Sequence, residues 1–401
     1  MKDKNAPGGA HLRLCRIVTV PVTFATLLRQ QIKCIVDAGI DLTLVSSPGP
    51  ELDEIGRTTP VRCQAIAMAR KPAPARDVRA LVALTRFLYR ERFDIVHSST
   101  PKAGLLAALA GRAAQVPVRI HTYTGQAWVE LSGPVRWIAR ECDRLIGWLD
   151  THSYADSHSQ QEFLIAEGLV KASKITVLGA GSISGVDLRR FDPALAASVR
   201  ASIRHQLGIA EMSLVIVFVG RVTRDKGIVE LLDAFRMLRK CCGDIHLVLV
   251  GPFEPERDPL PPETLEDLSA DAHIHAVGFV RRPEEYLAAG DVFCLPSYRE
   301  GFGSVVIEAG AMSLPAVTTQ VTGLVDAIVD GETGILVPSK DTVALMEALK
   351  TMIESPELRH RMGQAARERA RSHFDARVVN QAMVDEYYRL LGTKWQNGCS
   401  T

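Results

Sequence analysis

Residues 214–227 have the sequence LVIVFVGRVTRDKG, in which six apolar residues lead through a glycine into a polar loop and a second glycine. The apolar run Leu214–Val219 is typical of a buried strand, and a helix is predicted from Gly227 to Lys240. A short buried strand followed by a loop and a helix is the repeating unit of parallel α/β sheets.

The same unit recurs on both sides of this stretch. Later strands are expected at Asp244–Val250, His273–Val277, Asp291–Leu295 and Pro315–Thr319. Earlier strands are expected at Cys15–Val20, Asp41–Val45, Val61–Ala67, Asp94–His97, Val118–His121, Thr151–Ala155 and Lys174–Leu178, with helices at Thr26–Ala38, Asp77–Arg90, Lys102–Ala114 and Gly133–Leu149. Two such arrays predict an α/β protein with two doubly wound domains and a cleft between them. We place the domains at residues 1–190 and 191–373, followed at 374–401 by a helix that crosses back to the first.

Composition and charge narrow the class of protein. The chain has 401 residues, of which 47% are apolar and 23% charged, so it is neither disordered, collagen-like nor a disulfide scaffold. Residues 1–190 carry a net charge of +8 and residues 191–401 a net charge of −7. The basic half is expected to meet an anion or an anionic surface. The overall charge of +1 gives no sign of nucleic-acid binding.

The eight cysteines have no C-x-x-C spacing, and several lie in apolar runs. They are interpreted as reduced core thiols of a cytosolic protein. Neither a signal peptide nor a run of about 18 apolar residues is apparent, so any membrane contact is expected to be peripheral.

A second informative loop is PSYREGFGSVVIEA, residues 296–309, which follows the predicted strand Asp291–Leu295. Gly301 and Gly303 leave backbone N–H groups uncovered at a helix start, where oxygen-rich ligands bind. Glu300 and Glu308 are placed to accept hydrogen bonds from sugar hydroxyls at two points of one ligand. The alternative is an ordinary first helical turn with a solvated Glu308.

Basic residues mark the loop after Gly220. Arg221 offers a fork of donors to phosphate oxygens, and Lys226 offers a point charge, so together they suit a diphosphate leaving group. The alternative is a solvated basic loop. The Glu300 segment elsewhere in the chain favours the diphosphate interpretation over this alternative.

These motifs resemble a known family. Gly220-Arg221 with Lys226-Gly227, Glu300-x7-Glu308 and the sequence DGETG at 330–334 resemble the signature of glycosyltransferase family 4, which has the GT-B fold and retaining stereochemistry. Val20-Pro21, SSPG at 46–49, HSSTPKAG at 97–104 and GSISGVD at 181–187 resemble its CapM-like capsule and O-antigen subgroup. That subgroup includes transferases that act on undecaprenyl-diphosphate-linked sugars.

The resemblance implies a role for each matching residue. Arg221 and Lys226 are expected to bind and stabilise the donor diphosphate, and Glu300 to contact the donor sugar. Glu308 is expected to hold the ribose hydroxyls. The remaining donor-binding residues are Gly220, Val280, Arg281, Gly301, Phe302 and Gly303. Two segments depart from the family pattern: PVTF at 21–24 replaces a glycine-rich loop, and Thr124 replaces a histidine for which His121 and Gln126 are the candidate substitutes.

No protein nucleophile is needed in this mechanism, because charge stabilisation at the leaving phosphate drives bond cleavage. The acceptor hydroxyl is expected to attack from the same face. The chain has no D-x-D sequence, the usual magnesium–diphosphate clamp of the other main transferase fold. A metal-independent enzyme without a cofactor is therefore predicted.

Acceptor contacts are predicted in the first half, at His97, Thr100, Lys102 and His121. Thr100 and Lys102 stand at the start of a helix that favours an anion, so Lys102 is expected to meet the lipid diphosphate of the acceptor. The alternative is a helix-capping Thr100 with a solvated Lys102.

A candidate membrane surface lies on the predicted helix Gly133–Leu149. Its arginines recur every fourth residue, and two tryptophans accompany them: Arg136, Arg140, Arg144, Trp137 and Trp148. This pattern favours peripheral binding to an anionic inner leaflet, and the alternative is a solvated arginine face with buried tryptophans.

The sequence thus predicts a cytoplasmic enzyme, peripheral on the inner face of the membrane. It would move a sugar, a hexose or N-acetylhexosamine, from a UDP-sugar to an undecaprenyl-diphosphate-linked saccharide. A GT-B UDP-sugar epimerase, a sugar-phosphate synthase and a non-catalytic partner in polysaccharide assembly remain as alternatives.

Overall fold

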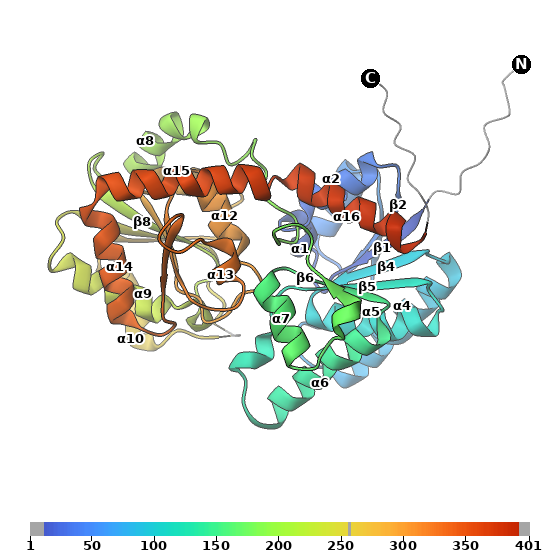
Figure 1. Cartoon of the computed structure of the whole chain (residues 1–401). Helices are drawn as coiled ribbons and strands as arrows, with labels where there is room; N and C mark the ends of the chain where they lie inside the picture. The colour runs from blue at the N-terminus through green and yellow to red at the C-terminus, as the bar shows by residue number, and fades with distance from the viewer. Residues whose placement is uncertain (1–11, 256–257, 393–401) are drawn as a thin grey trace, which may run out of the picture.

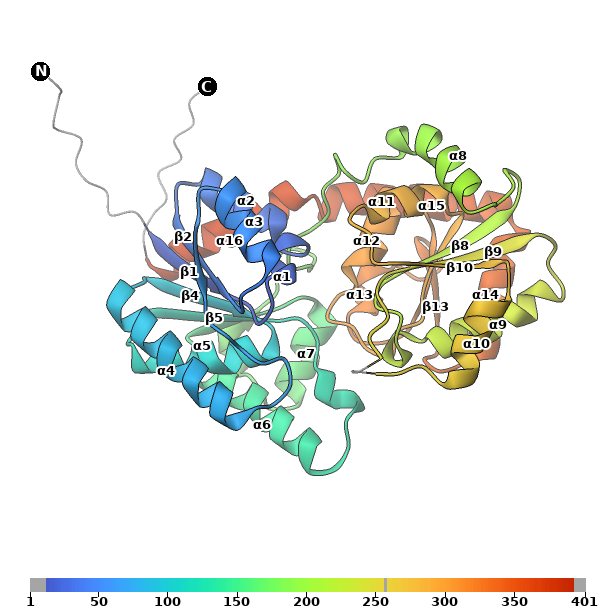
Figure 2. The same ribbon diagram turned by 180° about the vertical axis from the view of Figure 1, so that it is seen from behind.

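The computed structural model describes residues 12–255 and 258–392, which form two parallel sheets flanked by helices (Figure 1, Figure 2). The first half of the chain forms a seven-stranded sheet of order β3-β2-β1-β4-β5-β6-β7. The second half forms a six-stranded sheet of order β10-β9-β8-β11-β12-β13. In each sheet the order reverses beside the first strand, which is where open α/β sheets bind ligands. The predicted fold class, two doubly wound α/β domains, is confirmed.

The first sheet has short central strands that are almost fully buried, because helices cover both faces. Its strands are β1 (Arg13–Ile17), β2 (Asp41–Ser46), β3 (Arg62–Ala65), β4 (Ile95–Ser99), β5 (Val118–Tyr123), β6 (His152–Ala155) and β7 (Ile175–Thr176). Its helices are α1 (Val22–Ala25), α2 (Arg29–Asp37), α3 (Pro50–Thr58), α4 (Pro74–Glu91), α5 (Pro101–Ala113), α6 (Gly133–Leu149) and α7 (His158–Ala166). The helix predicted at Thr26–Ala38 begins only at Arg29, because Leu28 leaves the helical conformation.

The second sheet is built on the apolar strand that the sequence predicted at Leu214–Val219. Its strands are β8 (Leu214–Val219), β9 (Ile245–Val250), β10 (Ile274–Gly278), β11 (Val292–Leu295), β12 (Ala316–Thr319) and β13 (Gly334–Val337). The helices after β7 in the chain are α8 (Ala196–Gln206), α9 (Ile228–Arg239), α10 (Pro262–Ala270), α11 (Pro283–Ala289), α12 (Ser304–Ala311), α13 (Leu324–Ala327), α14 (Thr342–Glu354), α15 (Pro356–His373) and α16 (Ala376–Leu390).

The chain passes between the halves twice, and the two crossings are bonded to each other. The N–H of Val186 donates to the carbonyl of Phe374 at 2.7 Å, and the N–H of Ala376 donates to the carbonyl of Val186 at 2.9 Å. After this crossing α16 packs on α2 of the first half (Figure 1). The exact domain limits at residues 190 and 373 stay a prediction.

Cysteines in the described residues are free thiols. Cys15, Cys242 and Cys294 are buried in the cores, in agreement with the sequence analysis, whereas Cys241 is exposed. Cys399 lies outside the described residues.

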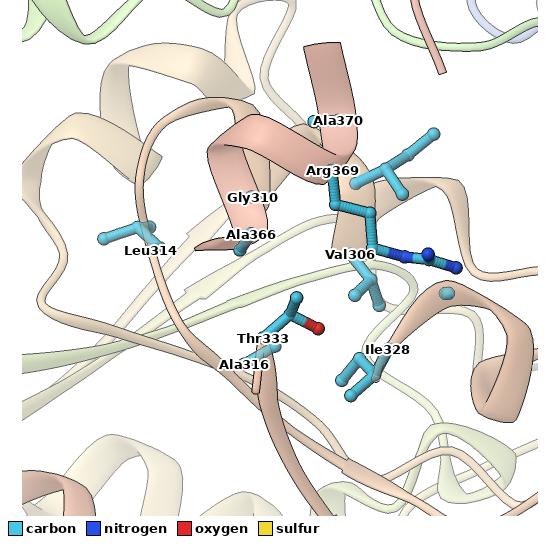
Figure 3. A pocket seen from close by; sticks show the side chains of 11 residues that line it. Val306, Gly310, Leu314, Ala316, Ile328, Thr333, Ala366, Arg369 and Ala370 are labelled. Carbon is cyan, nitrogen blue, oxygen red and sulfur yellow. The ribbon is translucent and has the colours of Figure 1, made fainter. Parts of the chain in front are cut away.

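A small cavity of about 10 Å³ lies between α12 and α15 in the second half (Figure 3). Its lining is mainly apolar, with Thr333 and Arg369 as polar members. A space of this size holds about one water molecule. It is therefore a packing defect between two helices and not a ligand site.

Candidate active site

The two loops singled out in the sequence lie together, at the carboxyl ends of the neighbouring parallel strands β8 and β11. The N–H of Tyr298 donates to the carbonyl of Asp225 at 2.9 Å and joins the loops. Gly227 begins α9 with a φ of 72°, and a Cβ there would lie 2.0 Å from the carbonyl oxygen of Pro296. Only glycine allows this approach, which brings the residue before it, Lys226, to the second loop.

Lys226 and Glu300 form an ion pair across the two loops. The Ser297 hydroxyl donates to the same Glu300 oxygen at 2.8 Å. The Lys226 and Glu300 side chains are only 14% and 16% exposed, so water screens their interaction weakly. Two of the three predicted catalytic residues are therefore held in one place, although 74 positions separate them.

Arg221, the third predicted catalytic residue, is fixed by two carboxylates. Its guanidinium is 3.1 Å from Asp225 Oδ2 and 3.4 Å from Glu254 Oε2. Arg299 also reaches Asp225 Oδ2, at 3.0 Å. Burial raises the pKa of Asp225, but the hydrogen bond from Thr223 and the nearby cations outweigh it and hold this pKa below its usual value. Asp225 thus stays ionised and organises the cations.

Sequence reasoning missed Asp225, Glu254 and Arg299. Asp225 and Arg299 lie inside the quoted loops, each next to a residue of opposite charge in the sequence. This alternation of charge was the available signal that they form ion pairs. Glu254 follows the predicted strand Asp244–Val250, at the same edge of the sheet. Its contact with Arg221 depends on the parallel pairing of β8 with β9.

Glu308 lies on α12, half-buried, with a cationic and an acidic neighbour. Burial raises the pKa of Glu308 to about 7, the charge of Arg190 lowers it, and Glu284 raises it further. Arg190 donates to Glu284 Oε2 at 2.7 Å and to the carbonyl of Arg281 at 2.9 Å. The structure therefore links the predicted donor residues Glu308 and Arg281 through Arg190, which the sequence analysis did not single out.

This environment predicts a pH-dependent effect of Glu308→Gln on stability. The folded pKa lies above the usual 4.5, so the folded state binds the proton more tightly, and this stabilisation is lost as pH rises from about 4.5 to 7. The variant is expected to melt near the wild-type temperature at pH 4.5 and above it at pH 8. The corresponding gain in the free energy of unfolding at pH 8 is on the order of 2 kcal/mol. Melting curves at the two pH values test this. A difference that does not change with pH would contradict it.

The first half contacts the site through a glycine loop. A Cβ on Gly301 would lie 2.6 Å from the carbonyl carbon of Thr124, and one on Gly125 would lie 3.1 Å from the backbone nitrogen of Gly301. The Ser157 hydroxyl donates to the carbonyl of Gly301 at 2.8 Å. Backbone from both halves therefore meets beside Glu300.

This contact helps to identify the residue that takes the place of the histidine found in many members of the resembled family. Thr124 lies against Gly301, whereas His121 and Gln126 are buried within the first half. The His121 ring bonds to Ser98 at 2.9 Å and covers Gly104. Of the three alternatives, Thr124 is the one whose backbone lies against the loop that carries Glu300.

The prediction that His97 and His121 contact the acceptor disagrees with the structure. Their exposed fractions are 0% and 2%. His97 is bonded to the Tyr387 hydroxyl at 2.8 Å and to Thr122 Oγ1 at 2.7 Å. Burial lowers the pKa of both histidines. They are neutral members of the polar network that joins β4 and β5 to α16, and in this structure neither ring is exposed to an acceptor.

Thr100 and Lys102 stand at the start of α5, as expected, but both already have partners. Lys102 Nζ lies 2.8 and 3.0 Å from the Asp77 carboxylate oxygens and 2.6 Å from the carbonyl of Lys71. The Thr100 hydroxyl bonds to Thr19 and does not cap the helix. A lipid diphosphate at Lys102 would compete with Asp77, so this contact remains a prediction that the geometry does not favour.

Known proteins share this architecture. Residues 24–181 match the family described as Glycosyl transferase 4-like domain, and residues 199–369 match Glycosyl transferases group 1. The chain is 31% identical over 379 residues to the capsular polysaccharide biosynthesis glycosyltransferase CapM of Staphylococcus aureus, covering 94% of this chain and 97% of that protein. It is 26% identical to the UDP-Gal:alpha-D-GlcNAc-diphosphoundecaprenol alpha-1,3-galactosyltransferase of Escherichia coli, covering 80% and 82%. The structure of Anabaena HepE in complex with UDP and glucose matches with a TM-score of 0.80 at 18% identity, covering 94% and 100%.

Two Rossmann-like sheets with polar loops at their carboxyl ends define the GT-B class, and the likeness to HepE establishes that fold. The chain belongs to glycosyltransferase family 4, as its motifs predicted.

Proposed function

We propose that this protein is a retaining transferase that moves a hexose or N-acetylhexosamine from a UDP-sugar to an undecaprenyl-diphosphate-linked saccharide, in capsule, O-antigen or related glycan biosynthesis. The observation that carries the proposal is the Lys226–Glu300 pair beside Arg221, at the carboxyl ends of β8 and β11. The names of the relatives support it, because one acts in capsule synthesis and another on a diphosphoundecaprenol-linked sugar.

The cations would act on the leaving group. As the bond between the anomeric carbon and the phosphate oxygen breaks, negative charge develops on the diphosphate, and Lys226 and Arg221 would stabilise it. The acceptor hydroxyl would attack from the same face and give its proton to that phosphate oxygen. Glu300 would orient the donor sugar through its hydroxyls, so that no protein nucleophile is needed.

The other proposed donor contacts follow the arrangement around α12. Glu308 would accept hydrogen bonds from the ribose hydroxyls, which requires its carboxylate form. Val280 and Arg281 would border the base, while the backbone of Gly220, Gly301, Phe302 and Gly303 would approach the sugar and diphosphate. Protonation of Glu308 below about pH 7 would then weaken donor binding.

Two other functions give different products in one assay. A UDP-sugar epimerase would release UDP without an acceptor-linked product, and a sugar-phosphate synthase would need no lipid. A non-catalytic partner would not turn over any donor. The paired Lys226 and Glu300 argue against loss of catalysis, because an unused site has no need for this partly buried ion pair.

Chelation is expected to leave the initial rate of transfer unchanged. Arg221 and Lys226 would supply the positive charge that a magnesium ion supplies in other transferases. The measurement is the initial rate of transfer in excess EDTA, at a temperature well below melting, compared with the rate in Mg²⁺. Activity that vanishes in EDTA and returns only with Mg²⁺ would overturn the metal-independent mechanism.

The surface of α6 supports the proposal that the protein binds an anionic membrane. Trp137 and Trp148 are 64% and 72% exposed, so the alternative of buried tryptophans is wrong. Val135 and Ile138 are exposed beside them. The arginine stripe is partly neutralised, because Arg140 pairs with Glu167 and Arg144 with Glu141. Across the described residues, we find no helix with the length and apolar character that a membrane span requires.

The Trp137→Ser, Trp148→Ser double variant is therefore expected to lose most of its binding to vesicles containing anionic lipid, since each exposed indole would bury in the interface. Co-sedimentation at low and high salt measures this. Met212→Ser is the matched control, because Met212 is 90% exposed but lies in the second half of the chain. A wild type that does not bind the vesicles at low salt would reject the proposal.

A further inference from the structure

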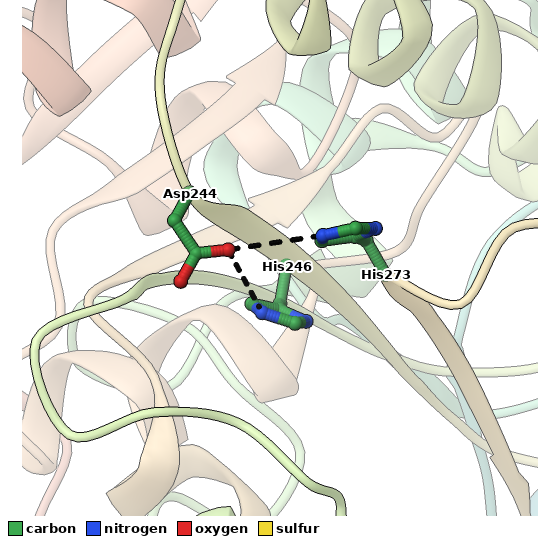
Figure 4. Close-up of side chains that lie close together, drawn as sticks. All are labelled: Asp244, His246 and His273. Carbon is green, nitrogen blue, oxygen red and sulfur yellow. Dashed lines mark ion pairs between the residues drawn. The ribbon is translucent and has the colours of Figure 1, made fainter.

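Imidazoles and carboxylates gather at the amino ends of β9 and β10, on the edge of the second sheet (Figure 4). Asp244 directly precedes β9, and His246 is the second residue of that strand. Because Ile274 pairs with Leu247, His273 continues the register opposite His246. The two rings lie 4.8 Å apart between centroids. Asp244, His246 and His273 form what we term the edge triad.

The distances between the ligand atoms of the edge triad are close to those in a metal site. Asp244 Oδ1 lies 3.4 Å from His246 Nε2 and 3.8 Å from His273 Nε2, and the three ligand atoms all lie within 4.8 Å of one another. In a tetrahedral zinc site with bonds of about 2.0–2.1 Å, ligand atoms lie roughly 3.4 Å apart. Small rotations of the partly exposed Asp244 and His273 side chains would close the difference.

Each member of the edge triad is oriented by a second group. His246 Nδ1 lies 3.0 Å from His275 Nε2, and His273 Nδ1 lies 3.2 Å from Asp271 Oδ1. The Ser213 hydroxyl donates to the other oxygen of Asp244. Metal-binding histidines characteristically use their second ring nitrogen in this way, which leaves the first free for the ion.

We propose that Asp244, His246 and His273 bind one divalent transition-metal ion, best matched by Zn²⁺, with water in the fourth position. Two nitrogen ligands and one oxygen ligand suit Zn²⁺ and not Mg²⁺ or Ca²⁺, which prefer oxygen. The site lies at the opposite end of β9 from the donor loops, and a strand of six residues spans roughly 20 Å. The ion would tie the edge strand β10 to β9 and take no part in sugar transfer.

Calorimetric titration of Zn²⁺ into untagged protein, stripped of metal with a chelator, tests the proposal. One Zn²⁺ per chain is expected, with a rise in melting temperature. Co²⁺ should give the visible absorption of a four-coordinate complex. His246→Ala and His273→Gln should each weaken binding by about 100-fold or more, and Asp271→Asn by about 10-fold or more.

Two controls separate this site from adventitious binding. His205→Gln removes an exposed histidine of α8, and Cys241→Ser removes an exposed thiol near Asp244, so both should bind Zn²⁺ as the wild type does. Because His246 is buried, the partly exposed His273 provides the variant least prone to misfold. Wild-type protein without stoichiometric binding, or binding that survives His273→Gln and is lost in Cys241→Ser, would overturn the proposal. Neither result would affect the proposed sugar transfer.

Discussion

Lys226→Ala is expected to lower kcat for sugar transfer by about 10²–10³-fold, the usual cost of removing one preorganised charge stabiliser. Lys226 is paired with Glu300 in a site with little exposure to water. In the proposed mechanism its charge acts most strongly when the diphosphate leaves, so the loss should fall on kcat more than on donor KM. Steady-state kinetics with saturating acceptor measure the two separately.

The pair also predicts non-additivity. Lys226→Ala leaves Glu300 without its cation, so the Lys226→Ala, Glu300→Ala double variant should lose much less than the product of the single losses. Lys350→Ala is the matched control, because Lys350 pairs with Glu354 on the surface of α14. A Lys226→Ala variant with wild-type kcat, or one that loses only donor affinity, would contradict the role of Lys226 at the leaving group.

Gly227→Ala is expected to destabilise the second half by several kcal/mol and to abolish most of the activity. The added Cβ would lie 2.0 Å from the carbonyl oxygen of Pro296, and φ is 72°. Either the loop after β8 or the loop after β11 must move, and the Lys226–Glu300 pair spans them. Melting curves and kcat are the measurements.

Two glycines of the same half separate the causes. Gly208 has a φ of 70° with no atom within 4 Å of an added Cβ, so Gly208→Ala reports backbone strain alone, about 1–2 kcal/mol. Gly243 has neither a positive φ nor a close neighbour, so Gly243→Ala should be near neutral. If Gly227→Ala were no worse than Gly208→Ala, the contact with Pro296 would not be what positions Lys226.

Local sequence patterns predicted the fold because both sheets are built from short apolar strands with polar loops. The strand Leu214–Val219 and the helix Gly133–Leu149 have the predicted bounds. The parallel arrangement then brings loops at carboxyl ends to one edge, so Arg221, Lys226 and Glu300 could be expected to meet.

Contacts between residues far apart in the sequence could not be predicted from local patterns. His97 looked like a ligand because it ends the predicted strand Asp94–His97, but the hydroxyl of Tyr387, 290 positions later, bonds to its ring beneath α16. Lys102 looked free because Asp77 lies on a different helix. Exposure of Trp137 and Trp148 depends on which face of α6 meets the sheet, and an arginine stripe leaves that choice open.

The central claim is tested most directly by the mass of the acceptor after reaction. Purified protein would be incubated with a panel of UDP- and GDP-sugars and a short-chain undecaprenyl-diphosphate-GlcNAc or -bacillosamine analogue. The mass of the lipid-linked product would then be measured by mass spectrometry. The proposal predicts a gain of one sugar from a UDP-sugar, lost in Lys226→Ala and Glu300→Ala. UDP release with no gain of mass on any lipid-linked acceptor would contradict it.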